Sequence, residues 1–553
     1  MRKFILVDHS LRDTGGHHYP YAASVLQAAE AAGFAPALAT HRDFRITTAF
    51  PSHWPLHALF PAVSYSAHTL DTQAKLPPAR SMLGRFMTPL REAWRRRQRH
   101  QHIEQFAAAC HELFRRLPLA EGDVVFLPTA SELDLHGLAA YLSTAPTIPG
   151  VQWHAQLHFG IHRDRQWRRH GDSAAVAAMR SSLQSSLAGC KPRPLHLWCT
   201  TEPLADQYQA LGVAEFRALP YPVHPYFSEF RQRRPQPLPA RIACLGHARR
   251  EKNQQALPAL LQQLWADAFA PGRAQLVVQN ARPRLRATLQ AGVQQLSATM
   301  PLAAGALPFD CSTGKLDQAQ YARLVCDSDI ALLLYDARRY HDRCSGVLLE
   351  MLVAGVPVVV PARSWLSDQI AASNQSWLLE AAQTLKAAGR LQGLAQSGAA
   401  TLPMPEGASG VLLTAEFPPQ AAEGYQIELI RHQANGEVIG RQTVWLEPPR
   451  GQQQCRRLIP LPPDCHSLTL KSDAGLTIEA ISGPLPPLGA LGVAIDDAAE
   501  AAIALRDILD HIEHYKGWSA RNAVRAAADS SAARIVERLL ERGSASVSRD
   551  ATR

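Results

Sequence analysis

Residues 340–357 read YHDRCSGVLLEMLVAGVP. Ser345 suits the first position of a helix, because its hydroxyl oxygen can accept a hydrogen bond from a backbone N–H that the helix leaves unpaired. The helix that follows is apolar except at Glu350, and a carboxylate in such surroundings is costly unless it binds something. Gly355 ends the helix. We therefore expect the backbone at Ser345 and Gly346 to suit a phosphate, and Glu350 to contact a ligand.

Two series of short apolar runs accompany this stretch. The first series lies at 4–7, 35–39, 123–127, 150–153 and 195–199, and the second at 241–245, 275–278, 330–334 and 356–360. Runs without alternation are typical of strands that are buried on both faces of a parallel sheet. Because helical patterns separate them, the order strand–helix–strand predicts an α/β fold with two Rossmann-like domains.

A different pattern occupies residues 404–487. Apolar and polar residues alternate there, and Asn435-Gly436 is a strong hairpin signal. We expect an antiparallel β-sandwich-like module inserted in the second domain. The expected boundaries are 1–228 for the first domain, 240–395 for the first part of the second, 404–487 for the module and 489–542 for the closing helices.

Composition narrows the class of protein. The chain has 553 residues, of which 46% are hydrophobic, so it has enough apolar material for sizeable cores and is not a disordered chain. The formal net charge of +9 permits an anionic partner without naming one. The nine cysteines form no C-x-x-C pair, no apolar run is long enough to span a membrane, and no targeting segment is visible. We expect a cytoplasmic protein with reduced thiols.

The loops that follow the first strand of each domain contain further candidate ligand-binding residues. Gly15 and Gly16 follow the first strand, where glycine lets a backbone approach a ligand closely. Arg249 and Lys252 follow the strand at 241–245, at the edge where ligands of open α/β sheets bind. Two cations there can neutralise a diphosphate leaving group without a metal. The dinucleotide fingerprint G-x-G-x-x-G is absent, which disfavours NAD.

Together these segments resemble the GT-B-fold retaining glycosyltransferases, the large group that includes sucrose and glycogen synthases and bacterial polysaccharide glycosyltransferases. The resemblance covers most of residues 1–375 and 489–540. Its most specific part is the block from Asp342 to Pro357, which contains Glu350. The family usually has Glu, seven residues and Glu there, and this chain has Asp, seven residues and Glu.

The resemblance implies a donor site. Its residues would be Gly15, Gly16, Arg249, Lys252, Ser345, Gly346 and Glu350. Arg249 and Lys252 would hold the donor diphosphate, and Glu350 would bind the ribose hydroxyls. Gly15 and Gly16 would line the cleft between donor and acceptor.

The resemblance also implies two residues near the transferred sugar, which we take as the catalytic candidates: His154 and Asp342. The family's reaction keeps the anomeric configuration, and the leaving phosphate is thought to help deprotonate the acceptor, so no general base is assigned. The nucleotide-diphosphate sugar would be a co-substrate, and no resident cofactor is expected.

Two motifs that could indicate a metal receive another interpretation. Asp327-Ser328-Asp329 matches a D-x-D metal motif but precedes a strand of the second domain, and His154, His158 and His162 do not share a predicted helix. No metal site is predicted. The basic run near Arg95, on a helical stretch at 88–117, is either a solvated face or a peripheral contact with an anionic membrane. No nucleic-acid module is visible.

The sequence therefore predicts a glycosyltransferase of the hexosyltransferase type that moves a sugar from a nucleotide-diphosphate sugar to a glycan or lipid-linked glycan, in polysaccharide biosynthesis. Two alternatives remain. One is a catalytically silent protein that binds a nucleotide or sugar on the same fold, and the other is a nucleotide-sugar epimerase.

Overall fold

Four sheets organise the computed structural model of this chain. It describes residues 1–14, 18–47, 50–61, 88–162, 165, 167, 173–190, 193, 195–229, 239–246, 249–312, 316–385, 387–394, 398–418, 424–472 and 475–550. Two sheets are parallel and two are antiparallel. The predicted α/β class, with two Rossmann-like domains and an inserted antiparallel module, is confirmed.

The first domain is built on a seven-stranded parallel sheet with the order β3-β2-β1-β4-β5-β6-β7. Its elements are β1 (Lys3–Asp8), α1 (His18–Ala31), β2 (Ala35–His41), β3 (Leu56–Phe60), α4 (Thr88–Arg116), β4 (Val124–Ala130), α5 (Glu132–Thr144), β5 (Gln152–Leu157), α6 (Ala174–Cys190), β6 (Leu195–Cys199), α7 (Glu202–Gln209) and β7 (Phe216–Ala218). The order reverses between β1 and β4, and ligands of open α/β sheets bind at such a reversal.

Buried polar contacts fix the helices of the first domain to the sheet. Ser131 and Asp134 form a capping box at the start of α5, in which the Asp134 carboxylate accepts from the Ser131 backbone N–H at 2.7 Å. The same carboxylate contacts His102 of α4 at 2.7 Å and His9, just after β1, at 3.3 Å. One buried acid therefore joins α4, α5 and the end of β1.

The second domain contains a six-stranded parallel sheet with the order β10-β9-β8-β11-β12-β21. Its elements are α8 (Tyr226–Glu229), β8 (Ala240–Cys244), η2 (Arg250–Lys252), η3 (Gln254–Ala256), α9 (Leu257–Gln263), η4 (Trp265–Phe269), β9 (Ala274–Gln279), α10 (Pro283–Thr299), β10 (Phe309–Ser312), α11 (Gln318–Cys326), β11 (Ile330–Leu332), α12 (Gly346–Ala354), β12 (Val358–Pro361), α13 (Trp365–Ala382), β21 (Gly492–Ile495), η5 (Ala498–Glu500), α14 (Ala501–Asp510) and α15 (Ile512–Asp529). Residues 230–238, which separate α8 from β8 in the sequence, lie outside the described residues.

The inserted module is a sandwich of two four-stranded antiparallel sheets, with the orders β13-β20-β15-β18 and β14-β19-β16-β17. Its strands are β13 (Ala387–Leu394), β14 (Gly398–Pro403), β15 (Ala408–Glu416), β16 (Tyr425–His432), β17 (Val438–Leu446), β18 (Gln454–Pro460), β19 (Ser467–Ser472) and β20 (Leu476–Ser482). Apolar residues of both sheets, such as Leu413 and Leu429, form one core between them. The strands begin at Ala387, earlier than residue 404.

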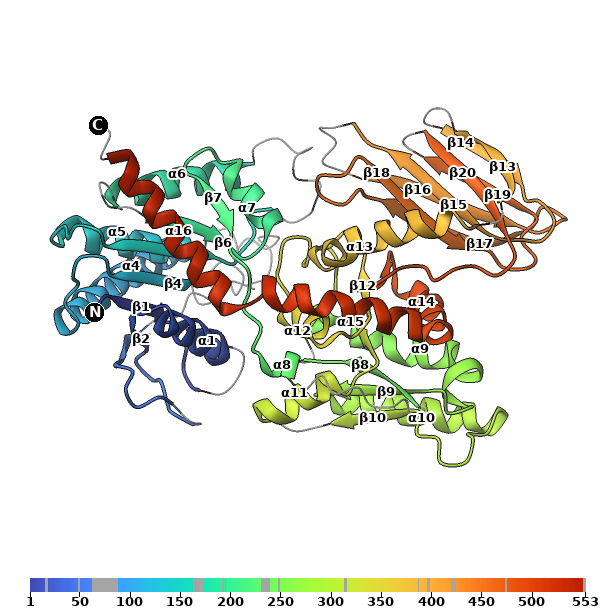
Figure 1. The fold of residues 1–553 in the computed structure, drawn as a ribbon, viewed down its shortest axis with the longest axis horizontal. Coiled ribbons are helices and arrows are strands. Elements are labelled where there is room, and N and C mark those ends of the chain that lie inside the picture. Colours follow the sequence, from blue (N-terminus) through green and yellow to red (C-terminus); the bar gives the residue numbers. More distant parts are fainter. Residues whose placement is uncertain are drawn as a thin grey trace.

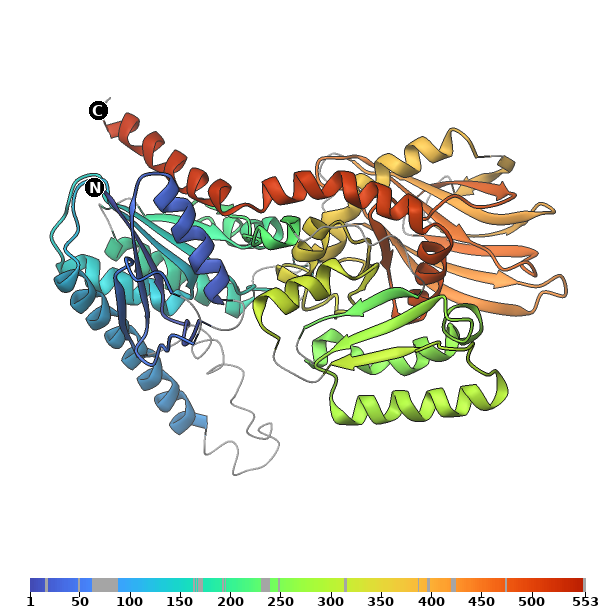
Figure 2. The same cartoon turned by 60° about the horizontal axis from the view of Figure 1, so that its bottom comes forward.

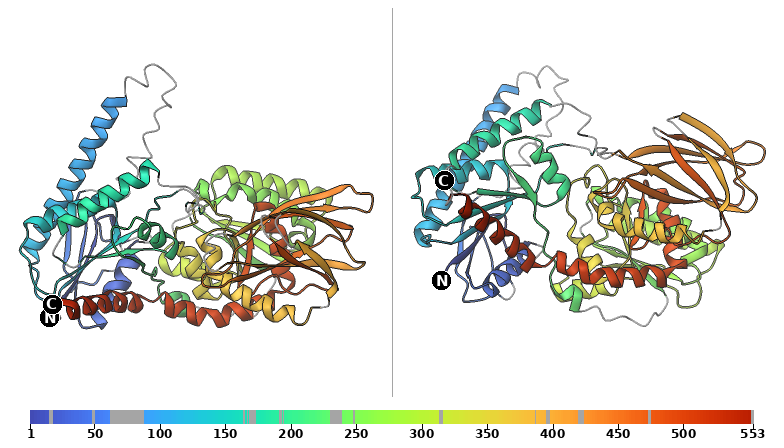
Figure 3. Two further views of the ribbon diagram at one scale, coloured as in Figure 1. Left: turned by 90° about the horizontal axis from the view of Figure 1, so that it is seen from above. Right: turned by 45° about the horizontal axis from the view of Figure 1, so that its top comes forward.

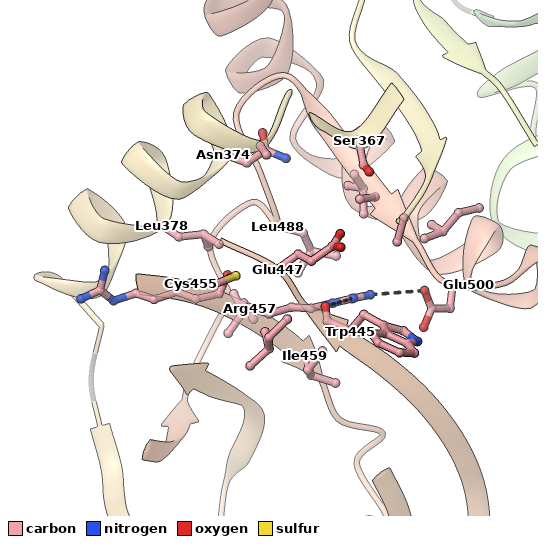
Figure 4. Close-up of a pocket in the computed structure, with 18 of the residues that line it drawn as sticks. Ser367, Asn374, Leu378, Trp445, Glu447, Cys455, Arg457, Ile459, Leu488 and Glu500 are labelled. Carbon is pink, nitrogen blue, oxygen red and sulfur yellow. Dashed lines mark hydrogen bonds and ion pairs between the residues drawn. The ribbon is translucent and has the colours of Figure 1, made fainter. Parts of the chain in front are cut away.

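The module docks on the second domain through a buried ionic contact. Arg457 of β18 lies 2.6 Å from Asp496 and 3.4 Å from Glu500, which follow β21. Figure 4 shows the Arg457 side chain extended toward Glu500. Gln375 of α13 also exchanges two hydrogen bonds of 2.7 Å with the backbone of Arg456. The module is therefore attached by polar contacts as well as by the chain itself.

The last helices cross both domains (Figure 1). α15 packs on α12 of the second domain, and α16 (Ala532–Asp550) packs on α1 of the first. Ile535, Val536 and Leu539 of α16 belong to the apolar core of the first domain. Figure 2 and the left view of Figure 3 show this pair of helices bridging the two domains along one side.

Among the described residues, no helix combines the length and apolar character that a bilayer span requires.

Candidate functional site

A cleft of about 290 Å³ lies between the two Rossmann-like domains. Its walls come from the carboxyl ends of parallel strands in both sheets. Asp8 ends β1, His158 follows β5, Thr200 follows β6, and Gly246 follows β8. This is the edge of an open α/β sheet at which ligands bind.

Lys252 and Arg249 supply positive charge on the second-domain wall. Lys252 Nζ donates to the Leu245 carbonyl at 3.4 Å and lies 4.9 Å from the centre of the Tyr335 ring. Burial lowers the pKa of Lys252 to about 8, because the charged form loses hydration. Arg249 is exposed, so it can move onto a ligand.

Gly246 makes room for that lysine. Its φ of +97° lies in the region that side chains rarely adopt, and a Cβ at this position would collide with Lys252 Nζ. The turn after β8 therefore favours glycine for its backbone conformation, and a methyl group there would displace the amine of Lys252 from its present position.

The N-terminus of α12 opens on the same cleft. The Ser345 hydroxyl accepts from the Leu348 backbone N–H at 3.3 Å, and Ser345 and Gly346 both line the cleft. The unpaired N–H groups of a helix start favour an anion. Gly355, with a φ of 73°, ends the helix as expected.

Glu350 projects from α12 into the cleft and is held by a neighbouring tyrosine. The Tyr321 hydroxyl donates to Glu350 Oε2 at 2.6 Å. Burial raises the pKa of Glu350 to about 7 in spite of this hydrogen bond and of the nearby Lys252. The structure therefore brings Arg249, Lys252 and Glu350 to one wall.

Sequence reasoning missed several residues of the cleft. They include Tyr21, His158, Tyr221, Tyr335 and Arg343. Arg343 adds a third cation beside Ser345, and its place in the stretch 340–357 was a signal that could have identified it. The Tyr21 hydroxyl donates to Gln156 at 2.9 Å, so this first-domain ring is fixed in position.

His154 lies elsewhere than expected. It is the third residue of β5 and is fully buried, with its Nδ1 accepting from the Trp198 indole at 3.1 Å. It does not line the cleft. The strand continues to Leu157, so the histidine that reaches the cleft is His158, whose Nε2 lies 2.5 Å from the Pro128 carbonyl oxygen.

Asp342 is also placed differently from the expectation. Its carboxylate accepts from Gln207 of α7 at 2.9 Å, and its carbonyl accepts from the Thr201 hydroxyl at 2.5 Å. Burial raises the pKa of this acid, and it does not line the cleft. The contact partners belong to the first domain, so Asp342 joins the two domains, and its expected role near the transferred sugar stays a prediction.

Two other parts of the sequence analysis concern the glycines after the first strand and the D-x-D motif at 327–329. Gly15 and Gly16 lie outside the described residues. Asp329 accepts from the Arg241 backbone at 2.8 Å and lies 2.5 Å from Lys516 Nζ, so this D-x-D motif serves the packing of the second domain. Across the described part of the chain, no group of three or more His, Cys, Asp or Glu could hold a metal ion.

The chain was compared with known families, curated proteins and solved structures. No family model and no curated protein matches this chain. Among solved structures, a Burkholderia xenovorans trehalose-phosphate synthase in complex with glucose-6-phosphate is 11% identical, with 66% of this chain and 87% of that chain covered and a TM-score of 0.45. An E. coli trehalose-6-phosphate protein bound with UDP-2-fluoro glucose is 12% identical, with 67% and 86% covered and a TM-score of 0.42.

A third solved structure is WaaG, a glycosyltransferase involved in lipopolysaccharide biosynthesis. It is 13% identical, with 67% of this chain and 84% of that chain covered and a TM-score of 0.37. The topology of the chain itself decides the fold. Two doubly wound parallel sheets face each other across a cleft, and the last helix returns to the first domain. This chain has the GT-B fold.

Proposed function

We propose that this protein is a glycosyltransferase that moves a sugar from a nucleotide-diphosphate sugar to a glycan or lipid-linked glycan acceptor. The observation that carries the proposal is the donor wall. Arg249, Lys252 and the start of α12 meet Glu350 at one edge of a cleft between two domains. A diphosphate and a ribose need such cations, N–H groups and a carboxylate acceptor.

The proposed reaction exchanges one bond at the anomeric carbon for another. The bond from this carbon to the donor phosphate oxygen breaks, and a bond to the acceptor oxygen forms. The acceptor proton passes to the departing diphosphate. Lys252, Arg249 and the N–H groups at Ser345 and Gly346 stabilise the negative charge that grows on the leaving group, which is where preorganised donors lower a barrier most.

The proposal also covers the metal requirement of the reaction, its stereochemistry and a contact with the membrane. Protein cations suit the leaving group, which supports a metal-independent reaction, and the resemblance to retaining enzymes supports retention of configuration. Contact with an anionic membrane would use the basic face of α4, on which Arg99 lies 3.5 Å from Glu132. That contact suits a lipid-linked acceptor and stays a prediction.

The test begins with nucleotide binding. The melting temperature is measured with UDP, GDP, ADP, TDP and CMP, with and without a divalent cation. One nucleoside diphosphate is expected to raise it without metal, because a ligand of the folded state stabilises by mass action. The double variant Arg249→Ala, Lys252→Ala should lose this rise. Full retention of affinity in the double variant would contradict the assigned site.

Product analysis then separates the classes of protein. Incubation with the matching nucleotide sugar and an acceptor glycan should release the nucleoside diphosphate and lengthen the glycan. Epimerised donor formed without acceptor would indicate an epimerase, and binding without turnover would indicate a silent binding protein.

A further inference from the structure

A second and larger cavity, of about 510 Å³, lies where all three parts of the chain meet. The first domain contributes Asp206 and Gln207 of α7, and the second contributes His341 and α13. The module contributes residues 447–453, between β17 and β18. Ligand pockets of proteins commonly have volumes of about 300–1,000 Å³ and lie between domains.

The cavity is separate from the donor cleft but close to it. The loop before α12 lies between them, since Tyr340 and Arg343 line the cleft while His341 lines the cavity. Gln207 also lines the cavity and holds Asp342 at 2.9 Å. The contact that joins the two domains is therefore the partition between the two spaces.

The charge at the cavity excludes anions. Arg165 lies 2.8 Å from Asp368 and 2.9 Å from Glu447, and Arg450 lies 2.9 Å from Asp206. Both guanidinium groups are therefore occupied by carboxylates, and Glu202 adds a further acid. A phosphate or an acidic sugar would be repelled by this uncompensated negative charge, whereas a neutral ligand would not be repelled.

We propose that this junction cavity is a second binding site, which holds a neutral glycan. Hydroxyl groups of a sugar can donate to carboxylates and accept from the exposed guanidinium of Arg450, and the half-buried ring of Trp167 offers apolar surface to its C–H groups. The site assigns a role to the β module, because the module supplies one of its three walls. This proposal rests on the lining and volume of the cavity, and it does not require that the protein transfers a sugar.

Direct binding tests the proposal. Calorimetric titrations use maltotriose, cellotriose and triacetylchitotriose as neutral probes and trigalacturonate as the anionic probe, with no nucleotide present. At least one neutral trisaccharide is expected to bind with a millimolar or tighter Kd, and the anionic probe more weakly. Absence of binding by all three neutral probes, or equal or tighter binding of trigalacturonate, would overturn it.

Variants locate the bound sugar. Trp167→Ala removes the half-buried ring that lines the cavity, and should weaken binding about fivefold to tenfold. Gln453→Trp fills the exposed rim and should abolish binding, whereas Gln294→Trp on α10 makes the same change at an exposed glutamine that lines none of the described cavities. Binding that survives Gln453→Trp would place the sugar elsewhere and overturn the proposal.

The donor cleft provides the independent readout. Both cavity variants should keep the nucleoside diphosphate affinity of the parent protein. Loss of sugar binding together with intact nucleotide binding supports the second site even if no sugar is transferred. Failure of nucleotide binding in the parent protein counts against the proposed function and leaves the sugar titration to decide the second site.

Discussion

Lys252 and Glu350 can carry opposite charges on one wall of the cleft. Burial moves the pKa of each group toward the neutral pH range. The pKa of Lys252 falls to about 8, and that of Glu350 rises to about 7. The two groups are both charged only between these values. Donor binding that uses both charges must therefore depend on pH within the physiological range.

We predict that nucleoside diphosphate affinity is highest between about pH 7 and pH 8. Below that window Glu350 is protonated and accepts more weakly from the ribose hydroxyls, and above it Lys252 loses the charge that holds the diphosphate. Titration calorimetry from pH 5.5 to 9.5 measures the profile. Lys252→Arg should remove the alkaline decline, because arginine stays charged. A flat profile in the parent protein would contradict this assignment.

Glu350→Gln should stabilise the free protein at pH 8 while weakening donor binding. The folded pKa of about 7 exceeds the ordinary value of 4.5, so the stabilisation from the protonated form is complete below about pH 4.5 and is lost as the pH rises through 7. The gain should be on the order of 1–3 kcal/mol at pH 8 and disappear near pH 4.5. Denaturant unfolding at both pH values checks this. An equal effect at both values would contradict it.

Gly246→Ala should displace Lys252 and strain the turn after β8. A Cβ would collide with Lys252 Nζ at a φ of +97°, so we expect a loss of about 1–3 kcal/mol in stability and of about tenfold in nucleotide affinity. Gly305→Ala is the matched control. Its φ is +77° with nothing near the added methyl group, so it should cost stability and leave binding intact. Equal nucleotide affinities in both variants would show that the lysine tolerates the methyl group.

At the residue scale the sequence predicted which residues meet on the second-domain wall of the cleft better than those on the opposite wall. Arg249, Lys252 and Glu350 were predictable because each follows a strong strand or lies in an apolar helix. His154 was expected at the end of its strand, whereas β5 continues to Leu157, because the end of β5 depends on how far its partner strands extend, which a single segment does not reveal. Asp342 contacts Gln207, a partner 135 residues away.

At the scale of elements, the buried contact of Arg457 with Asp496 and Glu500 attaches the module to the second domain. Arg457→Met would leave Asp496 and Glu500 buried without their cation, and removing one partner of such a pair typically costs about 3–5 kcal/mol. Arg456→Met is the control, since the contacts of Arg456 with Gln375 are made by its backbone. Limited proteolysis should cleave near the module in the first variant only. Equal resistance would indicate that the apolar contacts suffice.

Elements differed in how readily they could be predicted. The long buried strands and α4 were predictable, because continuous apolar runs and helix-forming composition are strong signals over such lengths. Short edge strands such as β7, β10 and β21 have three or four residues each and were missed. Their strand conformation comes from pairing with a neighbour already in the sheet, as β21 pairs with β12, rather than from their own pattern.

At the scale of the whole molecule, α16 makes the first domain depend on the end of the chain. Leu539 is fully buried in that domain, so Leu539→Ala should cost about 2–5 kcal/mol. Hydrogen exchange should show the lost protection in α1 and not in the second domain. Val524→Ala on α15, 70% exposed, is the control and should change little. Protection lost in the second domain instead would contradict this coupling.

The relation between domains could be predicted only in part. The two parallel sheets and the inserted module follow from patterns within each segment. The junction cavity does not, because its three walls come from α7, α13 and residues 447–453, and no local pattern reports their meeting. Resemblance to a family could not supply it either, since the module lies outside the part of the chain that the resemblance covers.

The position of α16 also bears on how the protein is made. About 500 residues separate α1 from α16, and Val25 and Leu26 of α1 share a core with Ile535. At roughly 5–20 residues per second, a ribosome needs about 25–100 s to synthesise that interval. Throughout this time the apolar face of α1 that α16 covers is bare on the nascent chain. The first domain to be synthesised is thus among the last to be completed, and its emergence favours a chaperone that shields this face until translation ends.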